Sequence, residues 1–154
     1  MSQPSISVAM CTHNGERFVA EQVDSILAQT MAVDEIVLSD DASTDATVAL
    51  ARDRVALFLA QNPSSRVQLR VIENTQALGV TRNFEQAIRA TAGEVVVLSD
   101  QDDRWSPERV ALSVAALGDD PTALLVHGDP EVLRRQLAAQ RATHQVPGAR
   151  IAVF

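Results

Sequence analysis

The chain has 154 residues, the length of one domain that can bury a substantial core. Its net charge is −7 and its 13 basic residues are all arginines, so it lacks the basic surface that a nucleic-acid groove needs. Because Cys11 is its one cysteine, no intramolecular disulfide can form and an oxidising compartment is not required.

The sequence shows no sign of a secretory leader or of a membrane span. Residues 1–4 carry no basic segment followed by an apolar one, and no apolar stretch approaches the roughly 20 residues of a membrane span. We therefore expect a cytoplasmic protein without an integral membrane segment. Peripheral association with the inner face of the membrane stays open.

The first strand and the first helix are predicted close to the N-terminus. Residues 6–10 form an apolar run that predicts a strand, and residues 11–15 form a polar turn that contains a glycine. Apolar side chains then recur at helical spacing. They predict a helix whose inner face consists of Phe18, Val19, Gln22, Val23, Ile26 and Leu27.

A second strand is predicted at residues 35–39, and it ends in the paired acids Asp40 and Asp41. Residues 42–45 supply N-cap candidates and an early acid for the next helix. That helix is expected to end near residues 62–63. Its predicted inner face consists of Val48, Ala51, Val55, Phe58 and Leu59.

A third strand is predicted at residues 67–72, where the alternating pattern indicates that it is less buried than the others. After the loop of residues 73–79, Thr81 can cap a helix that Gly93 ends. The predicted inner face of this helix consists of Phe84, Ala87, Ile88 and Thr91.

The run of apolar residues at 95–98 predicts a strand buried on both faces, as in a parallel sheet. Ser106 and Pro107 then offer a cap and a first helical residue. The inner stripe of that helix is Val110, Val114 and Leu117, and Gly118 closes it. With a fifth strand at residues 123–127, the alternation of strands and helices predicts an α/β fold with a mainly parallel sheet.

Polar loops follow three of the predicted strands, at residues 12–15, 40–44 and 100–103. Because the carboxyl ends of parallel strands lie at one edge of the sheet, these loops can converge on one ligand. The last loop contains three carboxylates, which repel one another unless a cation offsets them. Hard cations such as Mg²⁺ or Mn²⁺ take oxygen ligands. A solvated acidic turn is the alternative interpretation.

Four blocks of the sequence also occur in a recognisable order. They are residues 6–15 (ISVAMCTHNG), 38–45 (LSDDASTD), 98–107 (LSDQDDRWSP), and 74–84, with N-x-x-x-x-G followed by R-N. Over roughly residues 5–129 the chain resembles family 2 glycosyltransferases. The resemblance implies the GT-A fold, a Rossmann-like three-layer sandwich, and a nucleotide-diphosphate sugar as donor. The S-D-Q-D-D form is similar to a subgroup often described as rhamnosyltransferases.

The resemblance implies roles for the first two polar loops. Thr12, Asn14 and Glu16 would line the nucleotide edge of the first loop. In the second loop, Asp40 or Asp41 would accept the imide N–H of a uracil or thymine base, because a carboxylate is an acceptor only.

The resemblance implies a metal and phosphate region in the third loop. Asp100 would face the ribose, with Gln101 among the nucleotide-sugar contacts, and Asp102 together with Asp100 would hold the Mg²⁺ or Mn²⁺ that bridges the diphosphate. Arg82 would contact phosphate, or it is a solvated helix residue. Asp103 has a plainer reading as an acid near the start of the following helix.

Several other residues have a structural reading beside a functional one. His13 is a solvated turn residue or a metal ligand, and Cys11 is a small core residue or a reactive thiol. Trp105 either shelters the sugar or packs under the following helix. At the end of the fifth strand, His127 and Asp129 are candidates for a substrate contact.

The end of the chain departs from the resemblance. Residues 1–129 are the expected nucleotide-sugar-binding domain, whereas residues 130–154 form a divergent tail with a helix predicted at 130–143. No Asp or Glu follows Glu131, so no catalytic base is identified. We hypothesise that this is a truncated or frame-altered glycosyltransferase domain that retains the nucleotide-sugar half.

Three functional hypotheses remain open at this stage. The first is a metal-dependent transferase that moves a sugar from a UDP- or dTDP-linked donor, with inversion, to a hydroxyl of a glycan or lipid-linked acceptor. The second is a truncated module that binds the nucleotide sugar without transferring it. The third is an unrelated Mg²⁺-dependent phosphotransfer or receiver-like domain, although the chain has no lysine and no P-loop motif.

Overall fold

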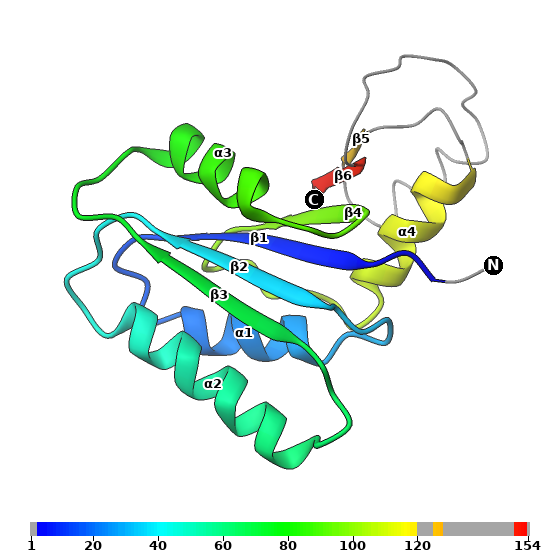
Figure 1. Cartoon of the computed structure of the whole chain (residues 1–154), viewed down its shortest axis with the longest axis horizontal. Helices are drawn as coiled ribbons and strands as arrows, with labels where there is room; N and C mark the ends of the chain where they lie inside the picture. Colours follow the sequence, from blue (N-terminus) through cyan, green and yellow to red (C-terminus); the bar gives the residue numbers. More distant parts are fainter. Residues whose placement is uncertain (1–2, 120–124, 128–149, 154) are drawn as a thin grey trace.

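The apolar runs of the sequence form one central sheet. The computed structural model describes residues 3–119, 125–127 and 150–153. Its strands are β1 (Ile6–Thr12), β2 (Glu35–Asp40), β3 (Gln68–Glu73), β4 (Val95–Ser99), β5 (Leu125–His127) and β6 (Arg150–Val153). They lie in the order β3-β2-β1-β4-β6-β5, and each neighbouring pair is parallel (Figure 1). The predicted parallel sheet is therefore confirmed.

Helices pack against both faces of this sheet, which gives three layers. The helices in the described residues are α1 (Val19–Leu27), α2 (Thr47–Gln61), α3 (Val80–Ala90) and α4 (Arg109–Asp119). Val8 and Met10 of β1 belong to one core with residues of α1, α2 and α4, while Ala9 and Cys11 belong to a second core with α3. This alternation follows from the two-residue period of a strand. The predicted α/β sandwich is confirmed.

The end of the described chain differs from the sequence prediction. A strand, β6, inserts between β4 and β5, although only a partly helical tail was expected after residue 129. The run Arg150–Val153 is only four residues long, so its sequence pattern does not distinguish a strand from a loop. Its strand structure depends on pairing with the neighbouring strands of the sheet. The helix predicted at residues 130–143 and residues 123–124 of the fifth strand lie outside the described residues.

Helix starts also differ from the predicted caps. Helix α3 begins one residue before Thr81, at Val80, and its N-cap is Gly79, whose φ is +84°. No side chain caps this helix, and Thr81 lies inside its first turn. Helix α4 begins at Arg109, whose N–H donates to the carbonyl oxygen of Ser106 (3.1 Å), and Gly118 lies inside its last turn.

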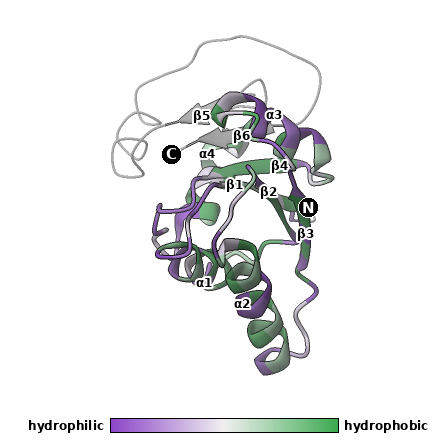
Figure 2. Ribbon diagram, turned by 90° about the vertical axis from the view of Figure 1, so that its left-hand side faces the viewer, coloured by the Kyte–Doolittle hydropathy of each residue, from purple (hydrophilic) through white to green (hydrophobic). Residues whose placement is uncertain are grey.

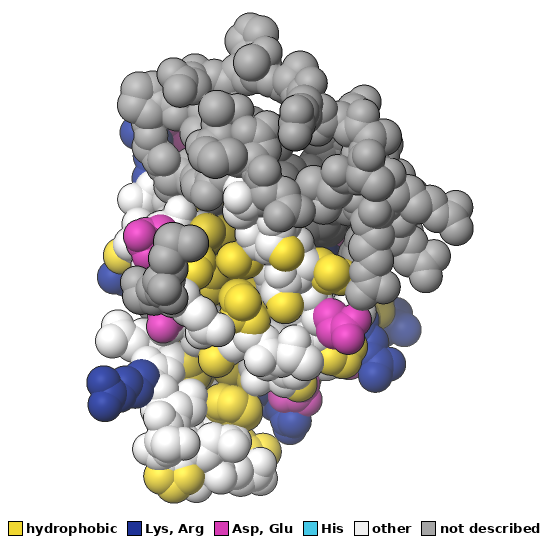
Figure 3. All heavy atoms as spheres, turned by 90° about the vertical axis from the view of Figure 1, so that its right-hand side faces the viewer, with side chains coloured by type: hydrophobic (Ala, Val, Ile, Leu, Met, Phe, Trp, Pro, Cys, Tyr) yellow, Lys and Arg dark blue, Asp and Glu magenta, His cyan; other side chains and the backbone are white. Residues whose placement is uncertain are grey.

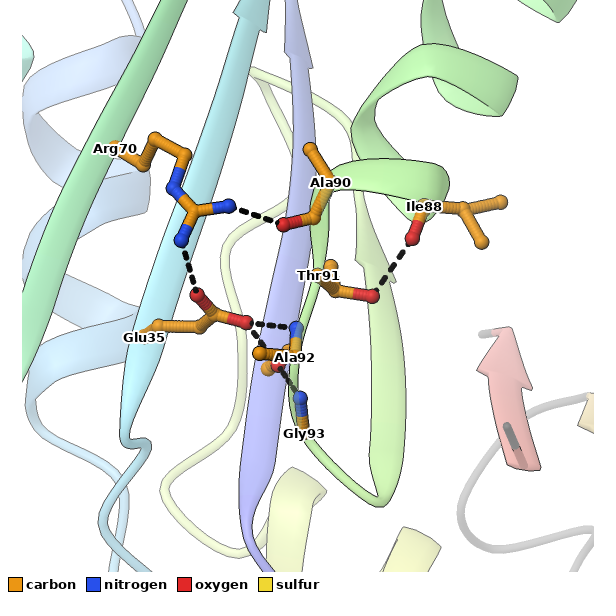
Figure 4. Close-up of polar contacts among 8 residues, drawn as sticks. Glu35, Arg70, Ile88, Ala90, Thr91, Ala92 and Gly93 are labelled. Atoms are coloured by element: carbon orange, nitrogen blue, oxygen red, sulfur yellow. Dashed lines mark hydrogen bonds and ion pairs between the residues drawn. The ribbon is translucent and has the colours of Figure 1, made fainter. Parts of the chain in front are cut away.

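The amino end of the sheet is held by a network around the buried Glu35 (Figure 4). The Glu35 carboxylate accepts hydrogen bonds from the Ser7 hydroxyl (2.5 Å) and the Ala92 N–H (2.5 Å) and pairs with Arg70 (3.9 Å). Arg70 also donates to the carbonyl oxygen of Ala90 (2.5 Å), and the Gly93 N–H donates to the Ser7 hydroxyl (2.7 Å). This network joins β1, β2 and β3 to the turn between α3 and β4.

The two sides of the molecule differ in polarity. The side that carries the carboxyl ends of the strands presents hydrophilic loops (Figure 2). On the opposite side, hydrophobic side chains gather in the middle of the surface, with acidic and arginine side chains around them (Figure 3). None of the helices in the described residues is long and apolar enough to cross a membrane.

Candidate functional site

A cavity of about 210 Å³ lies at the carboxyl edge of the sheet. Residues from the ends of β1, β2 and β4 line it together with residues of α3, and they are Cys11, Thr12, His13, Asp41, Val80, Asn83, Phe84, Asp100 and Gln101. Three polar loops that are far apart in sequence therefore meet at one site. This is the convergence that the parallel sheet predicts.

Asp41 supplies a charged acceptor to this cavity. Its carboxylate accepts hydrogen bonds from the N–H groups of Leu78 (2.6 Å) and Gly79 (2.9 Å) and from the Asn74 amide (3.3 Å). Burial raises the pKa of Asp41, but these hydrogen bonds, with His13 nearby, outweigh burial and lower the pKa below its ordinary value. Asp41 is therefore ionised at neutral pH, and it holds the backbone of Leu78 and Gly79 directly before α3.

Asp40, its neighbour in sequence, has a different environment. It is buried, and its carboxylate accepts hydrogen bonds from the Thr12 hydroxyl (2.7 Å) and from the N–H (2.9 Å) and hydroxyl (2.6 Å) of Ser43. Asp40 is the last residue of β2, and neighbouring side chains of an extended segment point to opposite faces. Ala42, which follows Asp41, has a φ of +60°. Asp40 builds the loop, whereas Asp41 lines the cavity.

The loop after β4 carries the carboxylates expected to hold a metal. Asp100 is exposed, and one of its oxygens accepts the Gln101 N–H (3.0 Å). Asp102 is exposed and has no hydrogen bond or ion pair to the described part of the chain. No group of three or more His, Cys, Asp or Glu side chains in that part could hold a metal ion. This arrangement suits Mg²⁺ or Mn²⁺ that takes one or two carboxylates and completes its shell with substrate phosphates.

Gln101 connects the first and third loops. Its side-chain oxygen accepts the His13 N–H (2.8 Å), and its side-chain nitrogen donates to the His13 carbonyl oxygen (3.1 Å). A Cβ at Gly15 would lie 2.3 Å from that side-chain oxygen, so only glycine leaves room for this contact. In the structure Gln101 therefore fixes the spacing of the two loops.

Two further candidates in the first loop do not line the cavity. Asn14 has a φ of +46°, and its side-chain oxygen accepts the Thr44 N–H (2.9 Å). Glu16 accepts the Ala46 N–H (3.2 Å) at the start of α2. Both side chains hold the first two loops together, whereas Thr12 both lines the cavity and donates to Asp40.

Arg82 and its neighbour Asn83 lie on different sides of α3. Arg82 is exposed and borders a separate hollow on the outer surface of the helix, together with Ile72 and Arg89. Asn83 is buried, lines the cavity and exchanges two hydrogen bonds with Ser39, at 2.6 and 2.8 Å. Asn83 was not among the residues expected at the site, although the R-N block contains it.

Several other residues have the structural role, rather than the functional one, of the two that the sequence allowed. The Cys11 thiol is buried, and burial together with Asp100 and Asp41 raises its pKa to about 12, so it stays protonated. The exposed His13 donates from Nδ1 to the Asp41 carbonyl oxygen (2.7 Å). Trp105 is buried in the core beneath α4, with Arg109 over its ring at 4.6 Å. Asp129 lies outside the described residues.

The fold and the site define an α/β protein with a ligand cavity at the carboxyl edge of its sheet. The family Glycosyl transferase family 2 matches residues 7–142, and the chain belongs to this family. EpsE of Bacillus subtilis (strain 168) is 34% identical over 116 residues, which are 75% of this chain and 39% of that protein. The chain thus spans well under half the length of this relative.

Solved structures show the same fold. The mannosyltransferase PcManGT from Pyrobaculum calidifontis, in complex with GDP-Man and Mn²⁺, matches with a TM-score of 0.69 and 28% identity over 88% of this chain and 39% of that chain. Glucosyl-3-phosphoglycerate synthase from Mycobacterium tuberculosis, in complex with Mn²⁺, UDP and glucosyl-3-phosphoglycerate, matches with a TM-score of 0.61 and 26% identity. This second match covers 88% of this chain and 50% of the synthase chain. The fold is therefore the GT-A fold.

Proposed function

We propose that this chain carries the donor half of a metal-dependent family 2 glycosyltransferase and binds a nucleotide-diphosphate sugar at the carboxyl edge of its sheet. The observation that carries the proposal is the pairing of two kinds of carboxylate there. Asp41 lines the cavity on one side, and the exposed Asp100 and Asp102 follow β4 on the other. The bound UDP and GDP-Man in the two structural relatives support this assignment.

Asp41 is the residue that would read the base. After accepting two backbone N–H groups and one amide, its carboxylate keeps a free lone pair on the oxygen that faces Gly79. Uracil and thymine present an imide N–H to such an acceptor, whereas cytosine presents a lone pair at the same ring position. The charge of Asp41 therefore favours a uracil or thymine nucleotide. Asp40 does not suit this role because it is buried and does not line the cavity.

Asp102, with Asp100, would hold Mg²⁺ or Mn²⁺ against the diphosphate. A cation bound there would stabilise the negative charge on the departing diphosphate. The protein contributes carboxylates that are exposed and, for Asp102, unpaired within the described residues. A net charge of −7 makes such neutralisation necessary before an anionic donor can bind.

The transfer step itself belongs to the same proposal. An acceptor hydroxyl, on a glycan or a lipid-linked sugar, would attack the anomeric carbon with inversion while a base takes its proton. No base is assigned among the described residues. The rhamnosyl donor suggested by the S-D-Q-D-D form and a cytoplasmic location, with peripheral membrane contact, are also part of this proposal.

Calorimetric titration with UDP and with CDP, both in Mn²⁺, tests the donor site. We expect the chain to prefer UDP by about tenfold or more, because a hydrogen bond to a charged group is worth roughly 1.5 kcal/mol or more. The variant Asp41→Asn should lose most of this preference, since an amide can both donate and accept. Asp53→Asn, an exposed acid on α2, is the matched control. A folded chain that binds neither nucleotide would overturn the proposal.

A further inference from the structure

The turn with the proposed metal ligands, residues 100–104, is attached at both ends to one side of α1. Residues Gln22 and Ser25 project from this side at positions i and i+3, and Gln29 follows the C-cap of the helix. Gln22 and Gln29 are buried although they are polar, and polar side chains are buried only where hydrogen bonds compensate them. Apart from Ser25, the partners of their side chains lie in residues 99–110, the segment that contains the acidic turn.

At the first end of the turn, Gln22 holds the last residue of β4. Its side-chain nitrogen donates to the Ser99 hydroxyl (2.6 Å), and that hydroxyl donates to the carbonyl oxygen of Asp100 (3.0 Å). Gln22 is 1% exposed and Ser99 is also 1% exposed, so water does not compete for these contacts. The series of hydrogen bonds that starts at Gln22 and passes through Ser99 therefore ends at the backbone of Asp100.

At the second end, Ser25 and Gln29 hold the residues after the turn. The Ser25 hydroxyl accepts the backbone N–H of Trp105 (3.1 Å). It also lies within hydrogen-bond distance of the Gln22 side-chain oxygen (3.2 Å). Gln29 donates to the Ser106 carbonyl oxygen (2.7 Å) and accepts the Val110 N–H (2.9 Å). Gln22 and Ser25 thus contact each other as well as opposite ends of the turn.

We propose that Gln22 and Ser25 are positioning residues that fix the Asp100–Asp102 turn in the geometry that a metal–diphosphate needs. The inference depends on the proposed donor site. The carboxylates themselves have few contacts, since Asp102 has none in the described part of the chain. Their positions are therefore set by the backbone of the turn, and that backbone is held at its two ends by α1. Loosening either end lowers the affinity for the metal without touching the base pocket at Asp41.

The test compares Gln22→Ala and Ser25→Ala with Ser7→Ala. Ser7 is also a buried residue with a hydroxyl that makes two hydrogen bonds, but it lies at the opposite end of the sheet. Two quantities are measured in the whole chain. The first is the factor by which Mn²⁺ tightens UDP binding, from calorimetry. The second is acrylamide quenching of Trp105, the single tryptophan of the chain, which reports on the far end of the turn.

We expect both α1 variants to lose about tenfold of the Mn²⁺ effect, because groups that orient metal ligands typically contribute 10- to 100-fold to metal affinity. UDP binding without metal should stay unchanged. Quenching of Trp105 should increase in both variants, whereas Ser7→Ala should change neither quantity even though it lowers the melting temperature. A Ser99→Ala change should reproduce the loss of Gln22→Ala, and the double variant should add nothing.

The outcomes separate this inference from the proposed function. If Mn²⁺ has no effect on UDP binding in the unmodified chain, the metal part of the proposed function fails, and quenching alone decides whether α1 holds the turn. If Mn²⁺ acts normally in Gln22→Ala and Ser25→Ala, the positioning role is wrong and the donor site stands. Equal losses in Ser7→Ala would show a general effect of stability and would also overturn the positioning role.

Discussion

The two ends of the sheet both carry carboxylates, but they treat them in opposite ways. At the amino end, Glu35 is buried and its charge is shared among Ser7, Ala92 and Arg70. At the carboxyl end, Asp102 is exposed and has no partner in the described residues. A carboxylate surrounded by protein donors supports the fold, whereas one held in the open is available to a ligand. The same residue chemistry therefore serves stability at one end and function at the other.

The largest expected effect is on stability, from Glu35→Ala. This change leaves the buried Ser7 hydroxyl without its acceptor, which costs about 1–3 kcal/mol, and it also removes the hydrogen bond from the N–H of the exposed Ala92. We expect the free energy of unfolding in urea to fall by about 2–4 kcal/mol. UDP binding to the remaining folded protein should be unchanged. A loss below about 0.5 kcal/mol, the size of an ordinary surface change, would show that the network does not support the fold.

A smaller effect is expected from Gly15→Ala at the carboxyl end. The added Cβ would displace the flexible end of Gln101 and break its two contacts with the His13 backbone. We expect a loss of about 1 kcal/mol in urea unfolding, because neutral hydrogen bonds contribute about that much. Nucleotide affinity should fall at the same time. Unchanged affinity would indicate that Gln101 does not fix the spacing of the loops.

The dependence of the free energy of unfolding on pH, in the acid range, tests the role of Asp41. Because the folded state lowers the pKa of Asp41, the folded protein binds fewer protons there than the unfolded chain. Its contribution to stability is therefore present above the ordinary Asp pKa of about 3.9 and is lost as the pH falls through the lowered pKa. Urea unfolding of the unmodified chain and of Asp41→Asn should differ at neutral pH and converge in strong acid. A constant difference across this range would contradict the role of the Leu78 and Gly79 N–H groups.

The smallest effect on stability is expected from Asp102→Asn. Since this carboxylate makes no hydrogen bond or ion pair with a described residue, its loss should change the free energy of unfolding by less than about 0.5 kcal/mol. Thermal unfolding without metal measures this directly, with Asp53→Asn beside it. A large destabilisation would mean that Asp102 supports the fold, as Glu35 does, and would remove the contrast between the two ends.

Much of the fold could be predicted from the sequence because strong local patterns were present. The run Val95–Ser99 reads as a strand buried on both faces, and the acids that follow it must then lie at the carboxyl edge. Strand β6 could not be predicted, since Arg150–Val153 is too short to show a period of its own. The contact between Asp41 and Gly79, directly before α3, was also hidden, because Asp41 reaches it from another loop.

The site was predictable at the level of loops but not of single side chains. Asp40 and Asp41 are chemically identical, and only their different hydrogen-bond partners separate the structural acid from the one in the cavity. Likewise Arg82 and Asn83 are adjacent, and the register of α3 decides which of them lines the cavity. Such choices depend on tertiary contacts, which a single sequence does not show.

The most direct test of the account is the affinity for UDP as a function of Mn²⁺, in the unmodified chain, in Asp102→Asn and in Asp53→Asn. We predict that Mn²⁺ tightens UDP binding at least about tenfold in the unmodified chain and in Asp53→Asn, and that Asp102→Asn loses this effect while it keeps the metal-free affinity. Binding that ignores Mn²⁺ in the unmodified chain, or the same Mn²⁺ effect in all three proteins, would contradict the account.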